Sequence, residues 1–178
     1  MISYTHIVLS YKMDIRKTPA KSVESLHSIS EETRAIILRK TGKDYQYAHQ
    51  LPEILNLRNC KDLVDVSALG GVRILDLSWC SRVTNVSSLG GVERLNLYGC
   101  TGITDVSMLG RVERLYLGGC TGITDVSMLG GVKYLFLSGC TGITDVSALG
   151  GVETLYLCGC TGVTDVSMLG GVKDIYLD

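Results

Sequence analysis

Residues 91–110 read GVERLNLYGCTGITDVSMLG, and this unit of twenty residues recurs with few changes from about residue 51 to the end of the chain. No insertion breaks the period. A fixed period of this length indicates a solenoid, in which one unit cannot bury its apolar side chains alone but a stack of units can. Six cysteines, each three residues after a leucine, mark the period: Cys60, Cys80, Cys100, Cys120, Cys140 and Cys160.

Each unit divides into three pieces. Residues 92–97 alternate apolar with polar or aromatic side chains, which predicts a half-buried strand. A turn, C-x-x-I-T-D, follows, and V-S-x-L-G-G then predicts a short 3₁₀ turn, with paired glycines such as Gly90 and Gly91 interpreted as residues that let the chain reverse. We expect one parallel sheet of seven strands, near residues 52–57, 72–77, 92–97, 112–117, 132–137, 152–157 and 172–177.

Residues 1–50 lack the repeat. A weak alternation over residues 2–9 suggests a short strand, and Thr18-Pro19 opens a predicted helix near residues 20–27. A second predicted helix has Ser30 as its N-cap, two acidic residues in its first turn and a glycine just past its end. We interpret residues 1–50 as a mostly helical N-terminal cap, and residues 51–178 as a solenoid of six repeats and a seventh strand.

Residues 115–123, LYLGGCTGI, resemble the leucine-rich repeat family in its cysteine-containing form. The continuation I-T-D-V-S-x-L resembles the convex segment of internalin-type repeats and is two residues shorter here. The resemblance implies an α/β repeat fold with a parallel sheet on the concave face, 3₁₀ turns on the convex side and a small helical cap. It also implies a protein-binding module rather than an enzyme, without naming the partner.

Composition and charge narrow the expected partners. The formal net charge of −1 provides no broad basic field for nucleic acid. The first residues lack the pattern of a secretory signal, and no run approaches the roughly 18 apolar residues of a membrane span. Seven cysteines, six of them at one repeat position, are unlike a secreted disulfide framework. We therefore expect a cytoplasmic protein with no membrane or nucleic-acid partner.

Comparison of the repeats with one another shows where the chain varies. Inward positions stay apolar, whereas the outward strand positions change and carry aromatic and arginine side chains, the types that dominate protein-binding hot spots. An alternative remains open, in which the aromatic side chains only stabilise the sheet by stacking across neighbouring strands. The predicted contact residues are Trp79, Arg94, Asn96, Tyr98, Arg114, Tyr116, Tyr134, Phe136, Tyr156 and Tyr176.

The repeated cysteines and aspartates raise the question of a metal site or a catalytic site. All three histidines lie outside the repeats and no Cys-x-x-Cys pair occurs, so the cysteines are interpreted as buried reduced thiols, with Cys158 as an outward, exposed thiol. Asn85 takes the place of the repeated aspartate in one unit, which favours a turn-capping role over calcium binding. With no nucleophile beside a base, we expect no enzyme, no cofactor and no metal.

Two functions from different classes follow. The first is a protein-binding module that contacts its partner through the concave sheet. The second is a self-assembling solenoid, a homodimer through the last strand, where Val172, Ile175 and Leu177 have no following segment to cover them. A chain truncated after Asp178 would show the same ending.

Overall fold

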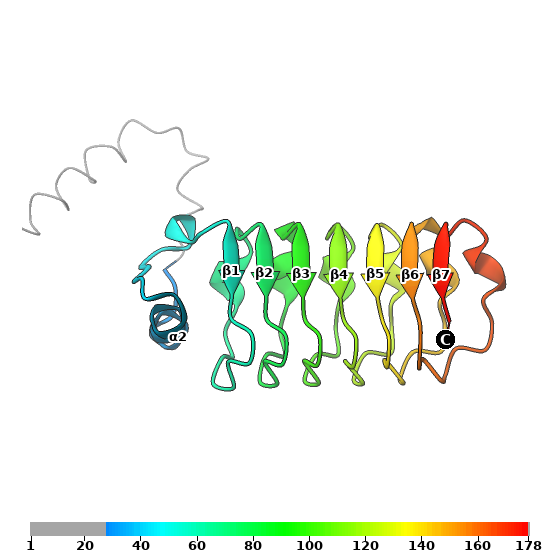
Figure 1. The fold of residues 1–178 in the computed structure, drawn as a ribbon, viewed down its shortest axis with the longest axis horizontal. Coiled ribbons are helices and arrows are strands. Elements are labelled where there is room, and N and C mark those ends of the chain that lie inside the picture. Colours follow the sequence, from blue (N-terminus) through cyan, green and yellow to red (C-terminus); the bar gives the residue numbers. More distant parts are fainter. Residues whose placement is uncertain (1–27, 178) are drawn as a thin grey trace, which may run out of the picture.

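The computed structural model describes residues 28–177, in which the repeats stack into one parallel sheet (Figure 1). Sequential strands are neighbours and pair with a register of twenty residues, so that Leu75 lies beside Leu95 and Leu95 beside Leu115. The predicted parallel sheet is confirmed. Its strands are β1 (Ile54–Asn56), β2 (Ile74–Asp76), β3 (Arg94–Asn96), β4 (Arg114–Tyr116), β5 (Tyr134–Phe136), β6 (Thr154–Tyr156) and β7 (Asp174–Tyr176).

The strands are half as long as the sequence pattern predicts, because turns close on them from both ends. Before β2, the Val72 N–H donates to the Leu69 carbonyl at 3.0 Å, and after it the Cys80 N–H donates back to the Leu77 carbonyl at 3.1 Å. The same two turns flank each strand from β2 to β6. Only three residues per repeat therefore remain in the extended ladder.

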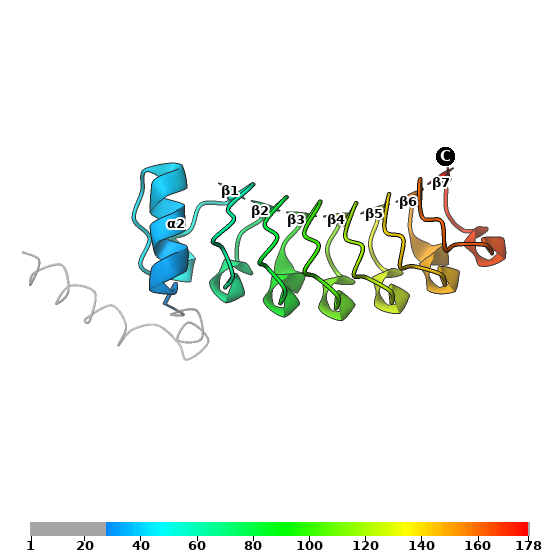
Figure 2. The same cartoon turned by 90° about the horizontal axis from the view of Figure 1, so that it is seen from below.

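Each repeat returns on the other side of the sheet through a short 3₁₀ helix, as predicted. Figure 2 shows the sheet on the inner, concave side of a gentle arc and these helices on the outer, convex side. They are η3 (Ser67–Leu69), η4 (Ser87–Gly91), η5 (Ser107–Leu109), η6 (Ser127–Leu129), η7 (Ser147–Gly151) and η8 (Ser167–Leu169).

A side-chain oxygen precedes each 3₁₀ helix and supports the turn. The Asp105 carboxylate accepts the Ser107 N–H at 2.9 Å, and Asn85 accepts the Ser87 N–H at 3.0 Å. This bond with the backbone of Ser107, joined by one with its hydroxyl, lowers the pKa of Asp105 below its usual value. The repeated aspartates thus have the predicted turn-capping role, which an amide can fill equally well.

The core runs through the length of the stack. In the repeat that begins at Val72, the inward residues predicted from the sequence are all buried. Equivalent residues of the next units pack above and below them in one continuous cluster. The seven buried residues of this repeat are Val72, Leu75, Leu77, Cys80, Val83, Val86 and Leu89.

The N-terminal end of the stack is covered by helix α2 (Glu31–Thr41), with a short 3₁₀ helix, η2 (Ala48–Gln50), leading into β1. The prediction for α2 is confirmed, since Ser30 accepts the Thr33 N–H and Gly42 ends the helix with φ of 70°. Within residues 28–177, no helix is long and apolar enough to cross a membrane.

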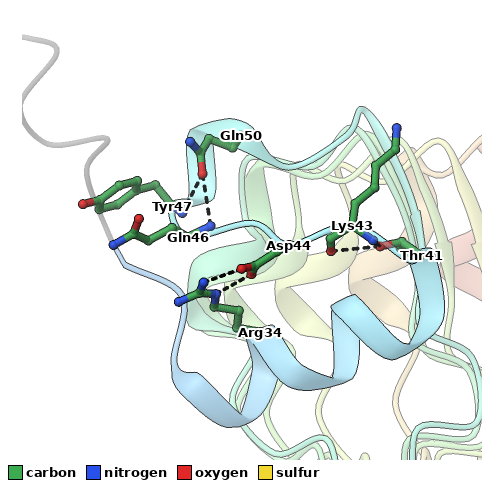
Figure 3. A network of polar contacts seen from close by, with 7 residues as sticks. All are labelled: Arg34, Thr41, Lys43, Asp44, Gln46, Tyr47 and Gln50. Carbon is green, nitrogen blue, oxygen red and sulfur yellow. Dashed lines mark hydrogen bonds and ion pairs between the residues drawn. The ribbon is translucent and has the colours of Figure 1, made fainter. Parts of the chain in front are cut away.

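The cap is joined to the first repeat by both apolar and polar contacts. Ile36 and Ile37 enter the common core, and the buried Thr33 hydroxyl donates to the Asp65 carbonyl at 2.7 Å. Within the cap, Arg34 pairs with both carboxylate oxygens of Asp44, and the Gln50 side chain accepts two backbone N–H groups (Figure 3). The predicted strand 2–9 and helix 20–27 lie outside the described residues, and the domain boundary at residue 50 stays a prediction.

The glycine that follows the leucine of each 3₁₀ turn, from Gly70 to Gly150, does not have the role that the sequence suggested. Gly110 has an ordinary right-handed φ of −62°, so the turn does not require glycine there. A Cβ at Gly110 would instead lie 2.2 Å from the Met128 carbonyl oxygen of the next repeat. Close approach of two backbones therefore requires glycine. The same contact, at 2.2–2.7 Å, occurs at Gly70, Gly90, Gly130 and Gly150.

We expect Gly110→Ala to destabilise the protein by about 1–3 kcal/mol, because the next repeat must move away from the added methyl group. Gly71→Ala is the matched control, since nothing lies within 4 Å of a Cβ at Gly71. Urea unfolding followed by circular dichroism measures both variants. An unchanged midpoint for Gly110→Ala would show that the repeats do not approach each other as closely as described.

Candidate functional site

The concave face is built from the side chains that point outward from the strands and from the turns just after them. The structure places all ten predicted contact residues there, but it divides them into four groups with different surroundings. Tyr116, Phe136, Tyr156 and Tyr176 form a stack; Arg94, Arg114 and Tyr134 form a second cluster; Trp79 and Tyr98 form a third; and Asn96 belongs to a row of turn-forming side chains.

The stack runs along the C-terminal half of the sheet. Its ring centroids are 4.3 Å apart from Tyr116 to Phe136, 4.3 Å from Phe136 to Tyr156, and 4.2 Å from Tyr156 to Tyr176. The interplanar angles are between 4° and 13°, so the inner rings cover each other's faces. Desolvation in the stack, followed by the neighbouring Tyr176 hydroxyl, raises the pKa of Tyr156. The stack thus stabilises the sheet, and the parts of it that a partner could contact are chiefly ring edges and tyrosine hydroxyls.

A row of Asn and Asp occupies the same strand position in the N-terminal half. Asn56, Asp76 and Asn96 each accept the backbone N–H of the residue two places later, at 2.9–3.0 Å. The side-chain amide oxygen of Asn96 is therefore already used by the Tyr98 N–H. Asn96 therefore has a structural role in its own turn.

Two arginines lie side by side where these two halves meet. Arg94 of β3 pairs in register with Arg114 of β4, and Tyr134 of β5 is the next residue along the same row. The Arg114 guanidinium carbon lies 4.1 Å from the centre of the Tyr134 ring, in a cation–π contact. The Arg94 Nε atom is 3.5 Å from a carboxylate oxygen of Glu93.

The third cluster lies just beyond the strands. Trp79 and Tyr98 meet edge to face with ring centroids 5.3 Å apart, and their side chains are 42% and 44% exposed. A Cβ at Gly99 would lie 2.6 Å from the Trp79 ring, and one at Gly118 would lie 2.8 Å from the Tyr98 ring. Each ring thus packs directly against the backbone of a glycine in the following repeat, in space that a larger residue would fill.

Trp79 also has an unusual backbone. Its φ is 64°, in the left-handed region, and Asn59 has a φ of 60° at the same repeat position. Asn tolerates this conformation, but Trp does so only with strain. The later repeats have glycine at this position, namely Gly99, Gly119, Gly139 and Gly159.

The six repeated cysteines are buried free thiols, as predicted. Each thiol from Cys80 onward donates to a leucine carbonyl of the preceding repeat, for example from Cys100 to Leu77 at 3.1 Å. Burial raises the pKa of Cys100 and of Cys120 to about 12. Cys158, predicted to be exposed, is half-buried instead, because the next repeat lies beside it and its sulfur is 3.7 Å from the Tyr176 carbonyl oxygen. In residues 28–177 no three His, Cys, Asp or Glu side chains are grouped to hold a metal ion.

One row of charged residues was missed by the sequence analysis. It lies one residue before each strand, and its members form ion pairs with neighbours twenty residues away: Arg73 contacts both Glu53 and Glu93 at 3.4 Å. Lys133 contacts Glu113 at 3.6 Å in the same way. Opposite charges recurring at a spacing of twenty were the signal that could have identified this row.

The C-terminal end of the described stack is apolar. Ile175 and Leu177 are 38% and 45% exposed, and Val172 is half-buried against the core. The structure thus places the three predicted self-association residues at one edge. It does not test whether a second copy binds there.

No known family profile matches this sequence, and neither does any curated protein. Solved structures do. An internalin (inlF) from Listeria monocytogenes matches 80% of this chain and 46% of its own, with 23% identity and a TM-score of 0.57. An internalin C2 (inlC2) from the same species matches 70% of this chain and 60% of its own, with 21% identity and a TM-score of 0.46.

This chain therefore spans about half the length of those internalins. At these identities the likeness concerns the fold, and only the inlF match of the two has a TM-score above 0.5. The fold of residues 28–177 is a leucine-rich-repeat solenoid of the internalin type with a helical N-terminal cap, as predicted.

We expect Phe136→Leu to destabilise the protein by about 1–3 kcal/mol, because it removes two aromatic stacks from a half-buried position. Tyr176→Leu, at the end of the row, removes one stack and should cost about half as much. Urea unfolding compares the two variants. Equal midpoints for wild type and Phe136→Leu would mean that the stack does not stabilise the sheet.

Proposed function

We propose that this chain is a non-catalytic protein-binding module that contacts its partner through the concave face of the sheet. Trp79 is the observation that carries the proposal. A bulky residue in the left-handed region costs about 1–2 kcal/mol, and later repeats avoid that cost with glycine. Strain retained at an exposed aromatic side chain is typical of a functional position.

The neighbourhood of Trp79 suits binding. Trp, Tyr and Arg are the side chains most enriched at interface hot spots, and repeats two to four present Trp79, Arg94, Tyr98 and Arg114 on one face. The Trp79 and Tyr98 rings are held by each other and by Gly99 and Gly118. Because these rings are already ordered, a partner would lose little side-chain entropy on binding them.

A protein fits this face better than a nucleic acid or an anionic membrane surface. Those two ligands require a broad basic field, whereas the net charge here is −1 and the row beside the strands mixes both signs. Internalin-like folds are mainly interaction modules, and this general use supports the same conclusion.

Two further parts of the proposal rest on the thiols. All seven cysteines are free, which supports the cytoplasmic location expected from the sequence. The repeated thiols are also poor nucleophiles, because burial raises their pKa and the thiolate is the reactive form. This chemistry supports the proposed non-catalytic role.

Phage-displayed random peptides selected on the immobilised protein test the proposal. Trp79→Gly should weaken the selected peptides at least about tenfold, as loss of a hot-spot residue does. It should leave the urea midpoint unchanged or raised, because glycine relieves the strained φ. Met128→Ala is the control, since it removes an exposed apolar side chain from the convex side. Peptides that bind Trp79→Gly as tightly as wild type would place binding elsewhere.

A second candidate function is self-association through β7, favoured by the exposed Ile175 and Leu177 side chains. The same edge would receive the next repeat in a longer chain. Light scattering at high protein concentration should give the mass of a dimer for the chain described here, and Ile175→Lys with Leu177→Lys should restore the monomer. A monomer mass for the unaltered chain would exclude this candidate.

A further inference from the structure

The paired arginines on the concave face have unequal surroundings. Arg94 and Arg114 lie directly opposite each other on adjacent strands, which are about 4.8 Å apart, and like charges so placed normally destabilise a sheet. Arg94 has a carboxylate oxygen of Glu93 at 3.5 Å. Arg114 has no ion pair with any of residues 28–177, so its charge is not compensated by a carboxylate of this part of the chain.

The Nε atom of Arg114 is moreover buried without a hydrogen-bond acceptor. Leaving a buried donor without an acceptor costs about 1–3 kcal/mol, and more for a charged group. Most buried polar atoms in folded proteins are satisfied. An arginine that has neither this acceptor nor an ion pair, and that lies beside a second arginine on a variable face, indicates an anionic ligand that binds its terminal N–H groups.

Tyr134 holds the guanidinium in place for such a ligand. The guanidinium carbon lies 4.1 Å from the centre of the ring. The five N–H donors of a guanidinium lie in one plane as a rigid fork. A planar fork with a fixed orientation matches the two oxygens of a carboxylate.

We propose that Arg94 and Arg114 bind a carboxylate of the partner protein, supplied by an aspartate or glutamate side chain. This inference deepens the proposed function and depends on it. Carboxylate is favoured over phosphate because the proposed partner is a protein, and aspartate and glutamate are the ordinary anionic side chains of proteins. The ligand therefore bridges the two arginines through the terminal N–H groups of their guanidinium groups.

Titration of the ¹⁵N-labelled chain with sodium glutarate, observed at the arginine Nε–H signals, tests the site directly. The Arg114 signal, assigned by its absence in Arg114→Gln, should shift and saturate well before that of Arg82, an exposed arginine in a turn after β2. Sodium chloride at equal ionic strength is the salt control. A shift at Arg114 no larger or earlier than at Arg82 would overturn the site, and earlier saturation by inorganic phosphate would overturn the carboxylate assignment.

The displayed peptides distinguish failure of this inference from failure of the proposed function. Peptides selected on the wild-type chain should be enriched in Asp and Glu, and Arg94→Gln with Arg114→Gln should weaken them about tenfold or more. Peptides that depend on Trp79 but lack this enrichment would leave the proposed function intact and overturn the inference. Peptides indifferent to both Trp79→Gly and the arginine variant would overturn the proposed function itself.

Discussion

Backbone contact between consecutive repeats is the constraint on which the rest of the structure depends. From Gly70 to Gly150, the glycine that follows the leucine of each 3₁₀ turn would carry a Cβ only 2.2–2.7 Å from a carbonyl oxygen of the next repeat. The cysteine thiols reach back to leucine carbonyls in the same direction, as Cys120 does to Leu97 at 3.2 Å. The glycine contact and the thiol hydrogen bond both involve backbone atoms, so together they fix the position of each repeat against its neighbour. Equivalent residues therefore form straight rows across the sheet.

Because the rows are straight, each outward residue lies beside the equivalent residues of the neighbouring repeats. How these side chains interact depends on their chemical type. Flat rings in such a row stack, as Phe136 does between Tyr116 and Tyr156. Charges of opposite sign pair, as Arg73 does with the glutamates on either side. Like charges have no favourable arrangement within the row, and Arg94 beside Arg114 is such a case. The same geometry that stabilises one row thus leaves an unmet interaction in another.

The fold could be predicted from the sequence because the regular spacing of apolar residues shows directly which side chains are buried. The inward residues, the 3₁₀ turns, the turn-capping aspartates and helix α2 were all predicted, since each rests on local pattern or capping chemistry. The role of Gly110 was not, because an αR glycine looks the same in sequence whether it serves a turn or a close contact. The division of the concave residues into stacked, capped and unpaired groups depends on side-chain geometry between repeats, which spacing alone does not encode.

Position along the solenoid now separates stability from recognition on the concave face. In the C-terminal half the ring faces are used by neighbouring rings, and in the N-terminal half the Asn and Asp oxygens are used by backbone N–H groups. Between them, repeats two to four hold the groups that the fold does not use: the exposed Trp79 and Tyr98 rings and the orphaned Arg114 donor. A partner gains the most binding free energy from side chains whose hydrogen bonds and ring faces are not already used within the protein. We therefore expect the partner to bind across β2, β3 and β4 rather than along the longer aromatic row.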